Sequence, residues 1–355
     1  MKVVHFCQLG PNKSGMYEST KDQIKYERRL GVESDMIDPF IKENAGKLDG
    51  WLECSDWETA KDTEVWVVHA GLPPPLREYL AVSGNKEKHV VVTVMHGPVE
   101  NMLFKECSSA MLGLHHDRSF TEIHIGWIWE HDACVVINQH EYDVSKLYDE
   151  HNRLHYIPNS IDLERIDQEA TKWPYTNHPS VVVADCVRFE KNPAHVIWAM
   201  PGVVEKLPDA KLSVLSLPFD NIEFWRNIFY RSKNHNLIRG CIDNLHIKNG
   251  PLMPYMRGAD IIFNCNFSGI MSRVSMEAMA MGLPVVSTNG DYTKYHAKIF
   301  DIKDIADKIV QCWEDLQSSD LKQKTIEYAY ENFDRSKYVP EYIKLYEKLK
   351  EEKNV

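Results

Sequence analysis

Basic residues are in the minority in this chain of 355 residues. Its 41 Lys and Arg stand against 52 Asp and Glu, which gives a formal net charge of −11 at pH 7. A protein that binds nucleic acid or an anionic membrane over its whole surface needs a basic field, so this balance argues against such partners, though not against a local basic patch. No apolar run is long enough to span a bilayer, and the first residues lack a signal-peptide cleavage region. We therefore expect a cytoplasmic protein without a transmembrane segment.

Motifs of metal and redox chemistry are also missing. The 8 cysteines form no CxxC pair, and the 16 histidines form no HExxH or similar spacing. Several cysteines interrupt apolar runs, as is typical of structural thiols in a reducing compartment. His69, His115 and His116 are interpreted as surface or pocket-lining residues rather than as metal ligands.

Short apolar runs alternate with amphipathic segments along the whole chain. Residues 3–7, 65–69 and 90–95 read as buried strands in the first half, and residues 181–185 and 261–264 read as buried strands in the second. This alternation predicts the α/β fold class, in which helices cover both faces of a parallel sheet. The length suits two such domains of about 150–180 residues each.

A polar, proline-containing stretch, residues 171–179, separates the two alternating series and reads as a linker. We therefore predict an N-terminal Rossmann-like domain over residues 1–172 and a second doubly wound domain over residues 173–337. The charged amphipathic helix at residues 338–355 is expected to pack back on the N-terminal domain.

The most informative stretch is SGIMSRVSMEAMAMGLPVVST, residues 268–288. It predicts a helix over residues 273–281 with Ser272 as its N-cap, followed by a strand over residues 283–287. A small-residue loop before a helix exposes free backbone amides to an anion. Glu277, one turn into the helix, is placed to meet hydroxyl groups of the same ligand.

In the first half, several loops follow predicted strands. Residues 10–15, 69–71, 96–98 and 139–140 fall where ligands bind in open α/β sheets, outside the carboxyl ends of the strands. The segment from 100 to 129 is rich in His, Met and aromatic residues. It is interpreted either as an excursion at the binding cleft or as a surface helical pair that buries its own aromatic side chains.

At this point the residues carry a resemblance. The segment MEAMAMGLPVVST, residues 276–288, resembles the donor-site segment of retaining glycosyltransferases of the GT-B fold, in particular family 4. Further segments match the family in its order along the chain: FEKN at 189–192, YIPNSIDL at 156–163, PDAKL at 208–212 and MRGAD at 256–260. The resemblance implies a GT-B architecture, with two Rossmann-like, doubly wound domains facing across a cleft.

The implied chemistry is transfer of a sugar from a nucleotide-sugar to an acceptor hydroxyl with retention of configuration. A UDP-sugar is favoured over a GDP-sugar as donor, and no metal is expected because protein cations stabilise the leaving diphosphate. The acceptor is expected to be a glycan or a small molecule, and the oligomeric state is left open.

The resemblance also assigns roles to residues. Lys191 is expected to provide a cation to the diphosphate, His96 to lie near the donor sugar, and Glu277 to bind the ribose hydroxyls. Further donor contacts are expected from the glycine loop and from the loop before the helix: Ser14, Gly15, Gly269, Ile270, Met271, Ser272 and Arg273.

The sequence departs from the family at two positions. The family usually has two glutamates with seven residues between them, and the first normally contacts the donor sugar. With Glu277 as the second, Gly269 stands at the position of the first. Cys186 stands where an arginine is expected, so Arg188 or Arg273 is the candidate for the missing charge. Each assigned residue also has a structural reading, such as a solvated helix-face carboxylate for Glu277.

Two other functions stay open at this stage. One is a viral-type DNA glycosyltransferase that modifies a hydroxymethylated base, which requires a cationic groove and room for a base lifted from the stack. The other is a degenerate GT-B protein that binds a sugar nucleotide without catalysis, as the departures at Gly269 and Cys186 suggest.

Overall fold

The chain forms two compact units in a computed structural model. Unit 1 comprises Met1–Asp162 and Asp334–Val355, and unit 2 comprises Leu163–Phe333. The sequence places the corresponding divisions after 172 and after 337. The structure describes residues 1–7, 15–38, 46–47, 53–54, 56–69, 72, 74–96, 130–168, 172–185, 191, 193–215, 231, 235–244, 252–266, 271–289, 292–318 and 320–355.

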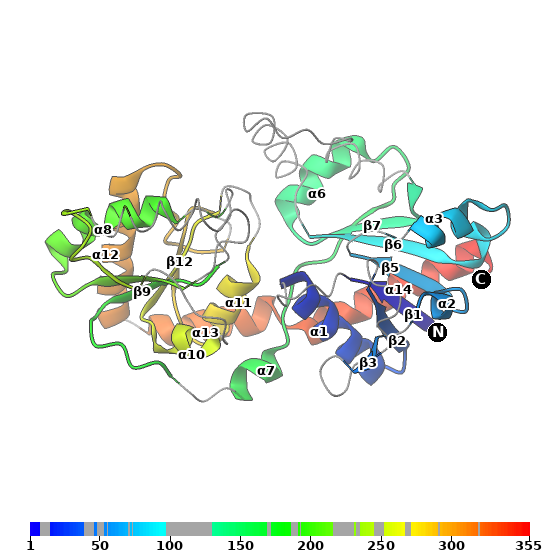
Figure 1. Ribbon diagram of the computed structural model, residues 1–355, viewed down its shortest axis with the longest axis horizontal. Coiled ribbons are helices and arrows are strands. Elements are labelled where there is room, and N and C mark those ends of the chain that lie inside the picture. Colours follow the sequence, from blue (N-terminus) through cyan, green and yellow to red (C-terminus); the bar gives the residue numbers. More distant parts are fainter. Residues whose placement is uncertain are drawn as a thin grey trace. The chain divides into compact units, whose positions relative to one another are not determined.

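Unit 1 is built on an eight-stranded sheet in the order β3-β4-β2-β1-β5-β6-β7-β8 (Figure 1). From β4 to β8 in this order, every pair of neighbouring strands is parallel. The short β3 runs antiparallel to its neighbour β4. The strands are β1 (Lys2–Phe6), β2 (Glu33–Ile37), β3 (Gly46–Lys47), β4 (Glu53–Cys54), β5 (Val65–Val68), β6 (Val90–Met95), β7 (Ala133–Val136) and β8 (Leu154–Tyr156).

Helices cover both faces of the unit 1 sheet because its central strands are apolar on both sides. On one face Tyr346 of the C-terminal helix and Val67 of β5 belong to one buried cluster, and on the other Leu76 and Trp66 of β5 belong to another. The C-terminal helix also lies beside the first helix. The helices of this unit are α1 (Gly15–Arg29), α2 (Trp57–Ala60), α3 (Pro74–Ala81), η1 (Lys86–Lys88), α6 (Gln139–Ser145), η2 (Lys146–Tyr148) and α14 (Arg335–Lys353).

Unit 2 contains a smaller sheet in which every pair of neighbouring strands is parallel. Its order is β11-β10-β9-β12-β13. The alternation of apolar runs and amphipathic segments therefore predicts the fold class correctly in both halves of the chain. The strands are β9 (Ser180–Val183), β10 (Lys211–Val214), β11 (Ile242–Asn244), β12 (Ile261–Asn264) and β13 (Val285–Ser287).

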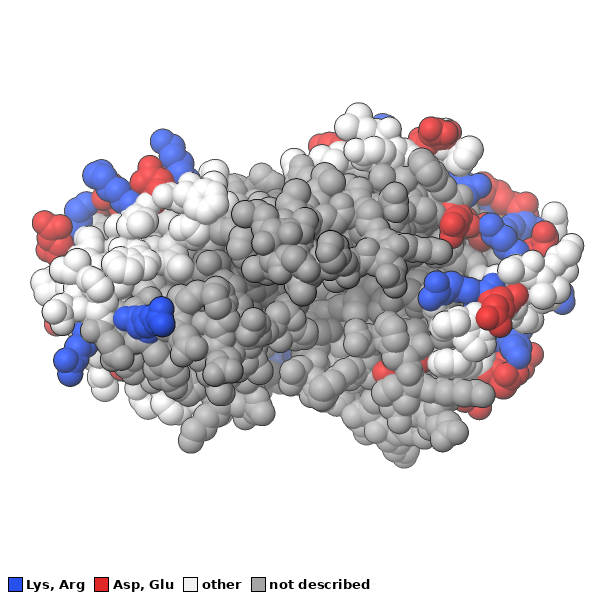
Figure 2. Space-filling model, turned by 45° about the horizontal axis from the view of Figure 1, so that its top comes forward, with Lys and Arg blue, Asp and Glu red and all other residues white. Residues whose placement is uncertain are grey.

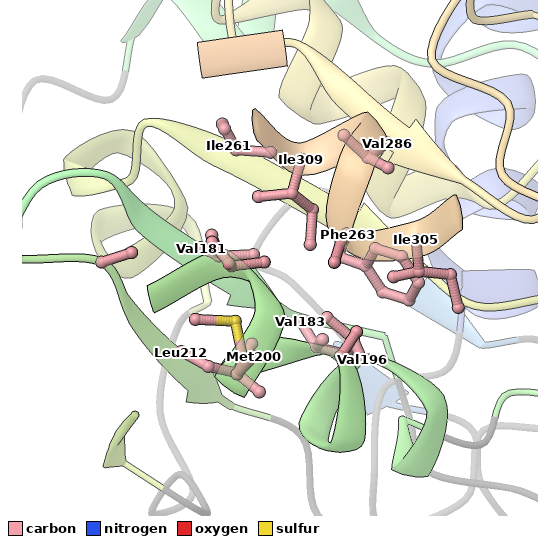
Figure 3. Packing of buried hydrophobic residues seen from close by; sticks show 14 of the residues in the cluster. Val181, Val183, Val196, Met200, Leu212, Ile261, Phe263, Val286, Ile305 and Ile309 are labelled. Carbon is pink, nitrogen blue, oxygen red and sulfur yellow. The ribbon is translucent and has the colours of Figure 1, made fainter. Parts of the chain in front are cut away.

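The core of unit 2 lies between this sheet and two long helices. Figure 3 shows Val181 and Phe263 from the strands meeting Met200 of α8 and Ile305 and Ile309 of α12. The helix α11 contacts α7, α13 and the strands β12 and β13. The helices are α7 (Leu163–Gln168), α8 (Ala194–Lys206), α10 (Met253–Gly258), α11 (Arg273–Ala280), α12 (Ile302–Ser318) and α13 (Leu321–Asn332).

The segment singled out in the sequence folds as predicted. The expected helix at 273–281 is α11, the expected strand at 283–287 is β13, and Ser272 is the N-cap. The region from 100 to 129, interpreted above as an excursion or a helical pair, lies outside the described residues. Among the helices that are described, none has the length and apolar character needed to cross a membrane.

Candidate functional site

Polar side chains gather where the central strands of unit 2 end. Asp185 lies two residues past β9, and Asn264 is the last residue of β12. One carboxylate oxygen of Asp185 accepts a hydrogen bond from Nζ of Lys191 at 2.8 Å, and the other accepts one from Nδ2 of Asn264 at 2.8 Å. Because parallel strands end at one edge of a sheet, this places Lys191 at the edge where α/β proteins bind ligands.

The start of α11 is attached to the same edge. Nδ2 of Asn264 also donates to Oγ of Ser272 at 2.9 Å, and this hydroxyl caps the helix by accepting from the backbone N–H of Ser275. The hydroxyl of Tyr292 lies 3.2 Å from Oδ1 of Asn264, which accepts its hydrogen bond, and 3.0 Å from Oγ of Ser287. The positive end of α11 is therefore held beside Lys191 by a buried polar network.

Glu277 lies one turn into α11 and is 8% exposed. Its Oε1 accepts from Nη2 of Arg165 on α7 at 2.5 Å and from Nε of Arg273 at 2.8 Å. Among the described residues, Oε2 of Glu277 has no hydrogen-bond partner. The two arginines thus fix the direction of the carboxylate through its Oε1.

Several predicted site residues lie outside the described residues, so the structure does not place them. These are Arg188 and Cys186 in the loop before Lys191, Gly269 and Ile270 in the loop before α11, and Ser14 in the glycine loop. The structure does place Arg273, the other candidate for the missing cation. Its side chain runs along α11 and forms an ion pair with Glu277, four residues further on.

Met271 and Gly15 occupy the approaches to two helices. Met271 is half-buried and directly precedes the N-cap of α11. Gly15 is exposed and opens α1, and a Cβ at this position meets no atom within 4 Å. The described part of unit 1 therefore gives no steric reason for a glycine at the start of α1.

In unit 1, His96 follows the end of β6 and belongs to a row of three imidazole rings. Its Nε2 lies 2.8 Å from Nδ1 of His69, and Nε2 of His69 lies 3.0 Å from Nδ1 of His5. The row ends inside the domain, where Nε2 of His5 lies 2.8 Å from Oε2 of Glu27. His5 and Glu27 are fully buried, and His69 is 6% exposed.

Burial disfavours a charge on the two outer rings. It lowers the pKa of His96 to about 4, and the positive charge of Arg335 acts in the same direction. The pKa of His69 is lowered well below its usual value, first by burial and then by the neighbouring His96, His5 and Arg335. For Glu27 burial opposes ionisation, yet interaction with His5 and hydrogen bonds from His5, Ser34 and Gln23 outweigh it and lower the pKa.

Reasoning from the sequence missed several of these residues. Asp185 and Asn264 have a detectable signal, since each is a polar residue at the end of an apolar strand. His5 interrupts the apolar strand VVHF and has the same kind of signal. Arg165 and Glu27 lie in charged amphipathic segments, where nothing separates an inward-pointing charged residue from its solvated neighbours.

The described residues contain no group of three or more His, Cys, Asp or Glu side chains placed to hold a metal ion. The row of histidines does not have the arrangement of a ligand set, because both nitrogens of His5 and of His69 are used in hydrogen bonds within the row. Among the residues that the structure describes, the cationic groups at the unit 2 edge are Lys191 and the two arginines beside Glu277.

Comparison with solved structures identifies the architecture. A glycosyltransferase from Rickettsia africae superimposes with a TM-score of 0.68 at 14% identity, covering 98% of this chain and 98% of that one. Sucrose-phosphate synthase from Thermosynechococcus elongatus gives a TM-score of 0.72 at 14% identity, covering 98% and 99%. The fold is GT-B.

A third structure with the GT-B fold, Anabaena HepE in complex with UDP-glucose, gives a TM-score of 0.71 at 12% identity, covering 97% of this chain and 99% of that one. No protein-family model and no curated protein matches the sequence. At these identities the likeness establishes the fold, and function has to be argued from the site.

Proposed function

We propose that this protein is a glycosyltransferase that moves a sugar from a nucleotide-sugar to an acceptor hydroxyl with retention of configuration. The observation that carries the proposal is the edge of the unit 2 sheet. There Lys191 and the capped start of α11 lie on one polar network. Glu277 lies one turn further along the same helix, where Arg165 and Arg273 orient its carboxylate. A nucleoside diphosphate requires these three features, namely a cation, free backbone amides and an acceptor for ribose hydroxyls.

The charge at this edge suits a departing diphosphate. Negative charge develops on the leaving group in the transition state, and donors that are already in place stabilise it without reorganisation. Asp185 holds Lys191 in position, and the network through Asn264 and Ser272 holds the N-terminus of α11. In this proposal Lys191 and the helix amides do the work that a metal ion does in other transferases.

A UDP-sugar is the donor that we favour. HepE from Anabaena has been solved with UDP-glucose and with UDP. The GtfA protein, an O-GlcNAc transferase with the same fold, has been solved with UDP and GlcNAc. The acceptor in our proposal is a glycan or small-molecule hydroxyl, and His96 is the unit 1 residue assigned to the donor sugar.

The DNA-modifying alternative lacks an observation in its favour. Among the described residues on the face in Figure 2, Lys and Arg side chains are interspersed with Asp and Glu. The other alternative is a protein that binds a sugar nucleotide without catalysis. Measuring transfer or hydrolysis of the nucleotide-sugar distinguishes it from a glycosyltransferase.

The proposal is tested by thermal unfolding with UDP, GDP and ADP and their glucose conjugates, because a ligand that binds the folded protein raises its unfolding temperature. We expect UDP and UDP-glucose to stabilise unit 2. Glu277→Ala and Lys191→Ala should each weaken UDP binding at least about tenfold, since each removes a charged hydrogen-bonding group.

Matched controls are Glu314→Ala and Lys322→Ala, which remove exposed charges of the same unit. They should bind UDP as the parent does. If the two site variants also bind UDP normally, the assigned site is wrong. If UDP-glucose binds but neither transfer nor hydrolysis is detected, with or without EDTA, the protein is a binder and not a transferase.

A further inference from the structure

The hydrogen bonds in the row of histidines of unit 1 couple the positions of the protons on its rings. Each contact between two imidazoles requires one nitrogen to carry the proton and the other to accept it. The row contains two such contacts, His5–His69 and His69–His96, and a third contact to Glu27. Consequently the position of one proton determines the position of the others.

Glu27 anchors the row at its inner end. Its carboxylate also accepts hydrogen bonds from Oγ of Ser34 and Nε2 of Gln23, and the hydroxyl of Tyr346 lies 3.4 Å from Oε1. A carboxylate with this many donors acts as an acceptor only, so Nε2 of His5 must carry a proton.

Two arrangements of protons then satisfy every contact. If His5 is neutral, its Nδ1 accepts from Nε2–H of His69, whose Nδ1 in turn accepts from Nε2–H of His96, and Nδ1 of His96 is an acceptor. If His5 is an imidazolium, each bond reverses, His69 and His96 carry their protons on Nδ1, and Nδ1 of His96 is a donor. Among the described residues this nitrogen has no hydrogen-bond partner.

We propose that Glu27, His5 and His69 are positioning residues that fix the ring of His96 and set, through the protonation of the buried Glu27–His5 pair, whether its outer nitrogen accepts or donates a hydrogen bond. The stacking of the rings supports a fixed orientation: the His5 and His69 centroids are 5.3 Å apart at 20°, and those of His69 and His96 are 5.1 Å apart at 41°.

The charged and titratable groups around the row come from two helices, α1 and α14. Glu27 on α1 faces His5, Tyr346 on α14 faces Glu27, and Arg335 on α14 exerts its positive charge on His69 and His96. Arg335 is held in place by Oγ of Ser19 and by the carbonyl of Ser160. Burial and the charge of Arg335 lower the pKa values of the two outer rings, so these rings stay neutral and change tautomer together with the Glu27–His5 pair.

The consequence for a ligand rests on the proposed function. A neutral ring that presents one defined nitrogen suits a sugar hydroxyl, which pairs with either an acceptor or a donor, and a fixed ring avoids the cost of ordering it when the ligand binds. His69 and His5 do not touch the ligand in this account; they act only through His96.

The first experiment uses the free protein with ¹⁵N-labelled histidine and reads the protonated nitrogen of each ring by NMR between pH 5 and 8. We expect one of two sets at every pH: neutral His5 with Nε2–H on His69 and His96, or charged His5 with Nδ1–H on both. A mixed set, such as Nε2–H on His69 with Nδ1–H on His96, would overturn the proposal.

The second experiment breaks the row with His69→Phe, using His89→Phe as control. His89 is also a buried histidine of unit 1, bonded to the carbonyl of Thr63 and to Tyr79 but not to the row. With His69→Phe we expect the ring proton of His96 to exchange rapidly with solvent, kcat/KM to fall about tenfold, the effect of one neutral hydrogen bond, and UDP affinity to be unchanged.

The control should retain the tautomer set and the parental kcat/KM. If His69→Phe matches the control in both, the positioning role is refuted. If His69→Phe fails to fold, the tautomer sets of the parent protein still decide the question. If the parent shows the expected sets but binds no nucleotide-sugar, the proposed function fails while the coupling within the row stands.

Discussion

In unit 1 a carboxylate and three imidazoles lie inside the domain, whereas in unit 2 the charged groups lie at the edge of the sheet. Glu27 has no exposed surface and is surrounded by hydrogen-bond donors of its own unit. Asp185 and Glu277 are mostly buried but bonded to cations that are themselves partly exposed. The interior network of unit 1, Glu27 with its three histidines, is suited to holding one side chain in place. The edge network of unit 2, which contains Asp185 and Lys191, is suited to offering charge to a ligand.

The largest expected effect comes from deleting the two anchoring carboxylates. Glu27→Ala leaves several buried donors without an acceptor, and we expect it to lower the free energy of unfolding of unit 1 by about 3–5 kcal/mol. Asp185→Ala frees Lys191 to turn toward water, and we expect a loss of about 1–2 kcal/mol in unit 2. Urea unfolding followed by hydrogen exchange resolves the two units.

Glu33→Ala and Glu205→Ala, which remove exposed carboxylates from unit 1 and unit 2, serve as controls and should change stability by less than about 0.5 kcal/mol. Equal losses for the two deletions would mean that the interior and edge networks contribute alike, and the contrast between the units would be wrong.

The sequence predicts the fold better than it predicts the site because fold class depends on repeated patterns. The prediction of two parallel sheets rests on many apolar runs of strand length, so a few irregular segments do not change it. A site depends on single residues. Glu277 and Lys191 are found through the resemblance, but one of the two arginines that orient Glu277, Arg165, comes from α7, 112 residues earlier in the sequence.

Buried charges are the hardest residues to predict. Glu27 lies in the segment KYERR of α1, and its neighbours Arg28 and Arg29 reach the surface. Which of these charged residues points inward depends on the rotation of the helix against α14, which comes from the other end of the chain. His69 shows the same limit: it is interpreted above as surface or pocket-lining, yet the structure places it in a buried row.

The second expected effect is a loss of stability between pH 7.5 and pH 5.0 that is larger in unit 1 than in unit 2. Burial lowers the pKa of His96 and of His131 to about 4, whereas an unfolded histidine titrates near 6.5. Between these values the unfolded chain binds more protons, so stability falls as pH falls. The described histidines with lowered pKa values all belong to unit 1: His69, His89, His96, His131 and His155.

One histidine with a folded pKa near 4 contributes stability that is complete above pH 6.5 and is reduced by about 2 kcal/mol at pH 5. Hydrogen exchange at pH 7.5 and pH 5.0, corrected for the intrinsic rates, should therefore show unit 1 opening more readily in acid than unit 2. His131→Phe removes one of these groups and should flatten the pH dependence of unit 1. An equal response of both units to pH contradicts this prediction.

The smallest expected effect compares the glycines that end one helix in each unit. Gly31 follows α1 with φ of +83°, and Gly282 follows α11 with φ of +80°. An alanine in this left-handed region costs about 1 kcal/mol.

A Cβ at Gly31 meets open space, but a Cβ at Gly282 lies 3.1 Å from Cδ1 of Ile326, so the Ile326 side chain must shift. We expect Gly282→Ala to cost a few tenths of a kcal/mol more than Gly31→Ala, measured by thermal unfolding, and to weaken UDP binding little because the N-terminus of α11 keeps its cap. If Gly31→Ala lowers the unfolding temperature more than Gly282→Ala does, the backbone cost at Gly31 is not the whole effect. The substitution would then also disturb the packing of α1 against α14.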